Sequence, residues 1–95
     1  MQFLTVSRRR ELPEGLDAEL SRAEVQRARE LYAEGSMRQL WHRADGPGAC
    51  VLWEVEDEAQ LWTLLKSLPF VGAGLVEISV IPLRPYAGFG PEKAS

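Results

Sequence analysis

The chain has 95 residues, of which 45% are hydrophobic and 26% charged, a balance typical of one folded domain rather than a disordered tail or a fibrous repeat. Its 11 basic and 14 acidic residues give a formal net charge of −3, so we do not expect a nucleic acid as its main partner. The sequence has neither an apolar run long enough to span a membrane nor the charge order of a signal peptide, so we expect a cytoplasmic protein. A single cysteine cannot form an internal disulfide, and one cysteine with one histidine cannot form a structural zinc site, so we expect no metal.

The first predicted elements are a strand and a helix. Residues 2–9 are β-prone and predict a strand, and the arginines at its end are expected to be solvated. The strand should end at residues 12–15, where a proline removes a backbone donor and a glycine frees the backbone. Asp17 is a suitable N-cap for a helix over residues 18–34, which are rich in Ala, Glu, Leu and Arg, and Gly35 stands where a glycine commonly ends a helix.

A β-hairpin is predicted next, followed by a second helix. Residues 37–43 and 50–55 predict two strands, and the Asp-Gly-Pro-Gly sequence at residues 45–48 is a turn signal that makes the pair antiparallel. Asp57, followed three residues later by Gln60, resembles a capping box and predicts the start of the helix.

The second helix should run to about residue 67, because Pro69 cannot continue it. Its apolar stripe consists of Leu61, Leu64, Leu65 and Leu68. Residues 70–74 predict a flexible loop, and residues 75–82 predict the last strand. We therefore expect the domain to span residues 1–83 and residues 84–95 to form a C-terminal tail.

The element order βαββαβ predicts an α+β fold of the ferredoxin-like type, with two helices on one face of a four-stranded antiparallel sheet. Strand alternation indicates which side chains meet the helices, namely Val51, Trp53 and Val55, and Val76, Ile78 and Val80. The opposite face is mixed and carries Cys50, Leu52, Glu54, Glu77, Ser79 and Ile81. Because a mixed face suits packing against another sheet, we expect a homodimer or a higher homo-oligomer, as in a dimeric α/β barrel, with a monomer as the alternative.

The first helix carries the clearest chemical clue, a carboxylate within an apolar stripe. Glu24 falls on the same side of this helix as Leu20, Ala28 and Leu31. Burial beneath the sheet would raise the pKa of the Glu24 carboxyl and suit it to general acid–base catalysis near neutral pH. Alternatively, Arg27 could pair with it one turn away and lower the pKa, or the side chain could simply meet water.

Further candidate site residues lie in the hairpin strands. His42 is the second catalytic candidate because a histidine titrates near neutral pH, although a surface position is its alternative. Arg38 and Arg43 could hold an anionic substrate, or could be solvated charges. Trp41 could line a pocket or an interface, and Glu54 is a possible cavity carboxylate. The expected substrate-binding residues are Arg27, Arg38, Trp41 and Glu54.

Over about residues 1–83 the chain resembles the muconolactone isomerase family, small enzymes of aromatic catabolism. The matching segments are Met1-Gln2-Phe3-Leu4, Leu12-Pro13, Glu24, Ala28, Leu31, Gly35, Arg38-Gln39-Leu40-Trp41, Trp53-Glu54-Val55, Leu61, Leu65, Leu68-Pro69 and Val80-Ile81-Pro82-Leu83. The resemblance implies a cofactor-free proton shift on a small carboxylic acid or lactone. It implies that Glu24 is both base and acid, and that His42 or Arg38 steadies the oxyanion or binds the substrate carboxylate. It also implies that the tail covers the pocket of a neighbouring subunit.

Two other functions remain open, because parts of the expected pocket differ from the family pattern. Val25 stands in place of a lysine, His42 in place of an arginine, and residues 47–50 in place of a polar stretch. One alternative is a non-catalytic module on the same scaffold that binds a small molecule or serves assembly. The other is a cofactor-independent monooxygenase of the related dimeric α/β-barrel group. A divergent isomerase would act on another small cyclic or polyketide-derived acid.

Overall fold

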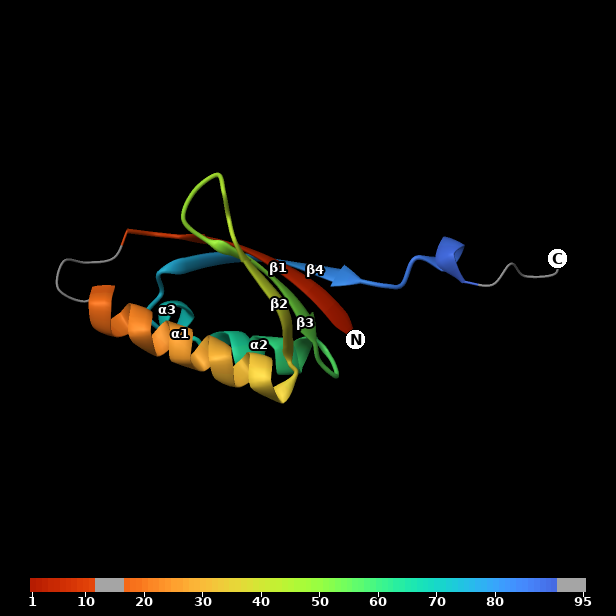
Figure 1. Ribbon diagram of the computed structural model, residues 1–95, viewed down its shortest axis with the longest axis horizontal. Helices are drawn as coiled ribbons and strands as arrows, with labels where there is room; N and C mark the ends of the chain where they lie inside the picture. The colour runs from red at the N-terminus through yellow and green to blue at the C-terminus, as the bar shows by residue number, and fades with distance from the viewer. Residues whose placement is uncertain (12–16, 91–95) are drawn as a thin grey trace.

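The computed structural model describes residues 1–11 and 17–90, which form a four-stranded antiparallel sheet with its helices on one face (Figure 1). The elements are β1 (Gln2–Arg9), α1 (Asp17–Glu34), β2 (Met37–His42), β3 (Ala49–Glu54), α2 (Glu58–Lys66), α3 (Pro69–Gly72), β4 (Val76–Leu83) and the short 3-10 turn η1 (Ala87–Phe89). The strand order β2-β3-β1-β4 places the first and third strands in the centre. This is the predicted ferredoxin-like arrangement of βαββαβ. No helix among the described residues is long and apolar enough to cross a bilayer.

The ends of α1 follow the sequence signals closely. The helix begins at Asp17, the residue expected to cap it. The segment at residues 12–15, which was predicted to end the first strand, lies outside the described residues. Gly35 ends the helix as predicted. Its φ of 92° is a left-handed conformation that favours glycine, and its N–H donates to the carbonyl of Tyr32 at 3.2 Å.

The capping box predicted for α2 is formed on one side only. The Asp57 side chain accepts a hydrogen bond from the backbone N–H of Gln60 at 2.8 Å, as expected. The Gln60 side-chain oxygen accepts from the N–H of Glu56 at 2.7 Å instead of from that of Asp57. Both bonds satisfy backbone donors at the helix start, so the cap is effective although its return bond is shifted by one residue.

The segment after α2 corrects the sequence prediction. Residues 70–74 were expected as a flexible loop, but α3 begins at Pro69 and extends to Gly72. Proline ends α2 because it lacks an N–H, and its fixed φ also suits the first position of a new helix. The N–H of Gly72 donates to the carbonyl of Leu68 at 2.9 Å, which closes the single turn.

The hydrophobic core lies between the sheet and the helices. Its buried side chains are Phe3, Leu31, Met37, Val51, Trp53, Val55, Leu61, Leu65 and Leu68. The apolar set predicted for β3 is therefore buried as expected, whereas Ile78 and Val80 of β4 are only partly buried beside it. Burying each large apolar side chain contributes about 1.5–3 kcal/mol, so this layer is the main stabilising term of the fold.

The other face of the sheet is covered by no helix in the described part of the chain (Figure 1). Large apolar side chains remain accessible in its strands. Trp41 is 49% exposed and Ile81 is 43% exposed. Beyond β4, residues 84–90 lead away from the sheet, and the exposed rings of Tyr86 and Phe89 pack edge to face at 4.7 Å between their centroids.

A buried hydrogen bond joins the two central strands. The indole Nε1 of Trp53 donates to the hydroxyl oxygen of Thr5 at 2.9 Å, and both residues are buried. Thr5→Val keeps the shape but removes the acceptor, so we expect it to lower the free energy of unfolding by about 1–3 kcal/mol, measured by urea denaturation. Thr5→Ser keeps the hydroxyl and is the control, and we expect it to lower the free energy of unfolding by a smaller amount. Equal stability of Thr5→Val and the native chain would contradict the assignment.

Candidate functional site

A cavity of about 950 Å³ lies between the helix-facing side of the sheet, helices α1 and α3, and the β2–β3 hairpin. Its wall is mainly apolar and includes Trp53 and Ile78, while its ionisable side chains come from several different elements. Small-molecule sites have this character, an apolar concavity with a few polar groups that fix orientation. The cavity is therefore the candidate site.

Glu24 is half-buried in the cavity wall and connects α1 to α3. Its Oε1 accepts a hydrogen bond from the backbone N–H of Phe70 at 2.9 Å. Phe70 is the second residue of α3, and N–H groups in the first turn of a helix have no carbonyl partner within the helix. The Glu24 carboxylate replaces the missing carbonyl acceptor with its Oε1 atom. Among the described residues, its Oε2 has no hydrogen-bond partner and is available to a ligand.

The surroundings of Glu24 favour its protonated form. Burial raises the pKa of this carboxyl above its ordinary value, and the smaller opposing effect of the Phe70 N–H only partly offsets it. Arg27 does not pair with Glu24. Its Nε donates to the Ser67 hydroxyl at 2.9 Å, and its Nη1 lies 3.2 Å from a Glu30 oxygen. Of the predicted alternatives, the ion pair with Arg27 is therefore not formed, and a half-buried carboxyl with a raised pKa agrees with the structure.

The raised pKa predicts a pH-dependent effect of Glu24→Gln on stability. The pKa of Glu24 is higher in the folded chain than in the unfolded chain, so protonation of this carboxyl stabilises the fold. This stabilisation is complete at a pH below the pKa of the unfolded chain, and it is lost as the pH rises through the pKa of the folded chain. Glutamine is neutral throughout. We expect Glu24→Gln to have a higher Tm than the native chain near pH 8, and the difference to shrink towards about pH 4. Glu19→Gln, at an exposed position of α1, is the control, and a constant difference across this range would contradict the prediction.

His42 lines the same cavity from its other side. It ends β2 and pairs with Ala49 of β3, which also lines the cavity. The side chain is exposed, so solvent and ligand can both reach it. The structure thus brings together the two predicted catalytic residues, Glu24 and His42, in the wall of one cavity.

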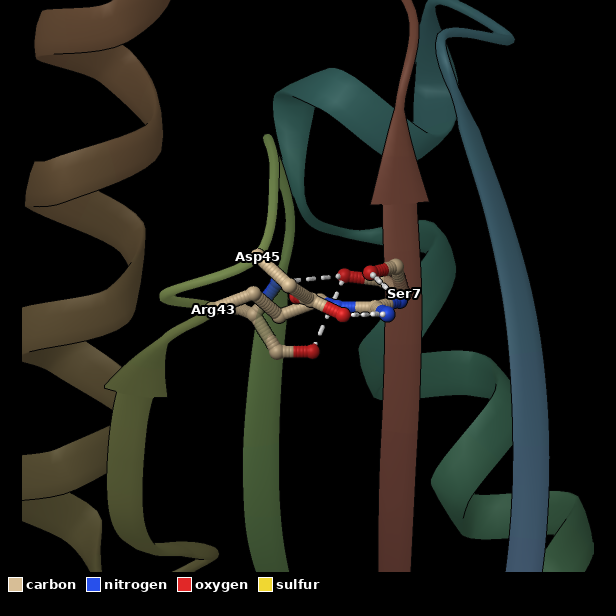
Figure 2. A network of polar contacts seen from close by, with 4 residues as sticks. Ser7, Arg43 and Asp45 are labelled. Carbon is tan, nitrogen blue, oxygen red and sulfur yellow. Dashed lines mark hydrogen bonds and ion pairs between the residues drawn. The ribbon is translucent and has the colours of Figure 1, made fainter.

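The hairpin loop is tied to β1 at the edge of the cavity by a polar network (Figure 2). Arg43 donates to both carboxylate oxygens of Asp45, at 2.9 and 2.8 Å, and to the backbone carbonyl of Ser7 at 3.3 Å. The Arg43 guanidinium holds the pKa of the Asp45 carboxyl below its ordinary value. The Ser7 hydroxyl in turn accepts from the N–H of Ala49 at 3.0 Å. Arg43 lines the cavity, but its charge is already paired with Asp45.

The four predicted substrate-binding residues lie outside the cavity wall. Arg27 is bound to Ser67 and Glu30 as described, and Arg38 is exposed on β2. Trp41 pairs with Cys50, a residue of the sheet face away from the helices. Glu54 accepts an ion pair from the Met1 ammonium group at 2.8 Å. Their part in substrate binding stays a prediction.

Arg9 and Phe70, the two cavity residues that matter most for the site, were missed at the sequence level. Arg9 was assigned to a solvated strand end, yet it is half-buried and lines the cavity. Strand alternation contained the signal, since Arg9 shares the parity of Phe3 and Thr5, which face the helices. Phe70 was assigned to a loop, and only the unexpected α3 presents its N–H to Glu24. Among the described residues, no three His, Cys, Asp or Glu side chains are grouped to hold a metal ion.

One family model and two solved structures are similar to the chain. The family model described as muconolactone delta-isomerase matches residues 1–88. The crystal structure of a muconolactone isomerase superposes with a TM-score of 0.83 at 21% identity and covers 99% of this chain and 98% of that one. A 5-chloro-2-hydroxyhydroquinone dehydrochlorinase from Burkholderia phenoliruptrix, in complex with 2,5-dihydroxybenzoquinone, has a TM-score of 0.67 at 20% identity and covers 88% and 94%. No curated protein sequence matches the chain significantly.

Proposed function

This chain belongs to the muconolactone delta-isomerase family, and we propose that it is a cofactor-free isomerase that shifts a proton within a small cyclic acid. The substrate class we propose is a lactone, or an aromatic or polyketide-derived carboxylic acid. The observation that carries the proposal is the Glu24 carboxyl, which has a raised pKa, lines a cavity and keeps one oxygen without a partner among the described residues.

Glu24 would act as both base and acid. In the first step, ionised Oε2 takes a proton from the carbon next to the substrate carbonyl, and the electron pair of the broken C–H bond passes into a dienolate. In the second step, the protonated carboxyl returns the proton to a carbon farther along the conjugated system. Atoms and charge balance, and Glu24 is regenerated. A raised pKa makes the ionised carboxylate a stronger base, so that proton transfer from the substrate carbon to Glu24 is less unfavourable.

The developing negative charge on the substrate oxygen needs a hydrogen-bond donor. We assign this role to His42, which lines the cavity with Glu24. Arg38 was the other candidate, and it lies outside the cavity wall in a single chain. The proposal therefore places base and oxyanion donor on α1 and β2, two elements that the fold holds on different sides of the cavity.

The proposed assembly is a homodimer or a higher homo-oligomer closed through the sheets. The uncovered sheet face supports it, because Trp41 and Ile81 are 49% and 43% exposed on that face and a second sheet could bury them. We also propose that residues 1–83 form the domain and that the tail from residue 84 covers the cavity of a neighbouring subunit. The exposed Tyr86 and Phe89, at 70% and 91%, would supply its contacts.

The proposal is tested by incubating the full chain with muconolactone in heavy water and following the ring protons by NMR. Isomerisation without oxygen uptake in an oxygen electrode is the expected result, and deuterium should enter the product only to the extent that the protonated Glu24 carboxyl exchanges with the solvent before it returns the proton. Substrate-dependent oxygen uptake would favour the monooxygenase. Binding of muconolactone without turnover, for this lactone and for a panel of related butenolide acids, would favour the non-catalytic module.

A further inference from the structure

The ionisable groups of the cavity are mostly cationic, although the chain as a whole is acidic. The formal net charge of the chain is −3, yet three arginines line the cavity, Arg9, Arg29 and Arg43, against one carboxylate, Glu24. A concave site with low-dielectric walls and charge of one sign concentrates ligands of the opposite sign. The three arginines differ in their ion pairing and in their exposure to solvent. Arg43 is paired with Asp45, and Arg29 lies on the exposed side of α1.

Arg9 is the half-buried cation of this group. It is the last residue of β1, and its backbone N–H donates to the carbonyl of Pro47 at 3.2 Å, which fixes the strand end against the hairpin loop. The Arg9 guanidinium carbon lies 5.4 Å from the centroid of the Phe70 ring. Such a contact orients the cation but leaves its N–H donors available. Within residues 1–11 and 17–90, no carboxylate forms an ion pair with Arg9.

Phe70 connects this cation to the proposed base. Its ring faces Arg9, while its backbone N–H donates to Glu24 Oε1 at 2.9 Å. Arg9 and Glu24 are thus held on two sides of one residue and line the same cavity. Among the described residues, Arg9 forms no ion pair with Glu24, so its charge is not used to neutralise that carboxylate. In the described part of the chain, a guanidinium without a carboxylate partner and a carboxyl oxygen without a hydrogen-bond partner therefore line one cavity.

We propose that Arg9 is the specificity-determining residue that binds the carboxylate of the substrate, so that the cavity selects small organic acids over neutral compounds of the same shape. The planar guanidinium can donate two parallel hydrogen bonds to a carboxylate, and the Phe70 ring fixes its plane. A substrate anchored in this way presents its ring to Glu24. This inference rests on the proposed function for the role of Glu24, but selection of acids by Arg9 is measured independently of turnover.

The test compares acids with their own primary amides. Dissociation constants are measured by NMR titration of the full chain with phenylacetate, 2-furoate and the muconolactone anion, and with the three corresponding amides. The native chain should bind at least one acid more tightly than its amide. Arg9→Gln should weaken binding of that acid about 10- to 100-fold and leave its amide unchanged, because a charge-assisted pair is lost. Arg9→Lys should keep part of the preference, since the charge remains and the fork geometry does not.

The matched control is Arg10→Gln, which removes an exposed arginine next in the chain and outside the cavity wall, and should change neither affinity. Equal affinity of the native chain for every acid and its amide would overturn the inference, and so would equal weakening of acid and amide by Arg9→Gln. Glu24→Gln separates the two proposals. If it keeps both the acid preference and turnover, the proposed function fails and the role of Arg9 stands. If it abolishes turnover while Arg9→Gln leaves acid binding unchanged, only the role of Arg9 fails.

Discussion

Replacement of Glu24 by glutamine is expected to lower kcat for isomerisation by about 10²- to 10⁴-fold, the usual contribution of a general acid–base group. Glutamine has the same shape, and its amide oxygen can still accept the hydrogen bond from the Phe70 N–H, which spans 2.9 Å in the native chain. The substitution therefore removes proton transfer while leaving the link between α1 and α3 in place. Initial rates with muconolactone, measured for variant and native chain at equal concentration, check the prediction.

The pH dependence of the native enzyme provides a second measurement of the same group. The base must be ionised, so kcat/KM should fall as the pH drops through the raised pKa of Glu24. The midpoint should lie above the ordinary value for a glutamate. Glu19→Gln, which changes an exposed carboxylate of the same helix, should leave rate and profile as in the native chain.

Glu24 has a competing structural role, since it also satisfies the N–H of Phe70. If that were its whole function, Glu24→Gln would keep both the hydrogen bond and the rate, whereas Glu24→Leu would lose stability. A Glu24→Gln protein with native kcat would therefore contradict catalysis by this carboxyl. Loss of turnover without loss of folding, judged by circular dichroism, would agree with it.

Much of the architecture was accessible from local sequence patterns. Alternation along residues 51–55 predicted that Trp53 would be buried, and Gly35 predicted the end of α1. Helical periodicity placed Glu24 on the side of α1 that carries Leu20 and Leu31. These predictions succeeded because each depends on the period of one element and on the single core that the element must face.

The contacts that these residues make with distant segments could not be predicted from local sequence patterns. The contact of Arg9 with Phe70, and that of Phe70 with Glu24, join segments that are distant in sequence, and both depend on α3, which no periodic pattern announces in four residues. The pairing of Arg43 with Asp45 depends on the path of the hairpin loop. Composition gives the number of charges but not their partners, so the availability of Arg9 emerged only from the structure.

Gly48→Ala is expected to produce the largest loss of stability among the substitutions considered. Gly48 has a φ of 141°, which side chains rarely adopt, and a methyl group there would run into the backbone carbonyl of Ser7. The Gly48 carbonyl also accepts from the N–H of Arg43 at 3.1 Å, and the Arg43 side chain in turn ties the hairpin to β1. Backbone strain and overpacking together should lower the free energy of unfolding by about 2–5 kcal/mol, measured by urea denaturation.

Two other glycines separate the causes of this loss. Gly74 has a φ of 72° and nothing within 4 Å of an added Cβ, so Gly74→Ala reports strain alone and should cost about 1–2 kcal/mol. At Gly72 the nearest atom to an added Cβ is 3.7 Å away, and Gly72→Ala should be close to neutral. Because Gly48 and Arg43 both line the cavity, Gly48→Ala should also weaken ligand binding, which neither control should do. If Gly48→Ala were no less stable than Gly74→Ala, the close approach of the hairpin to Ser7 would be refuted.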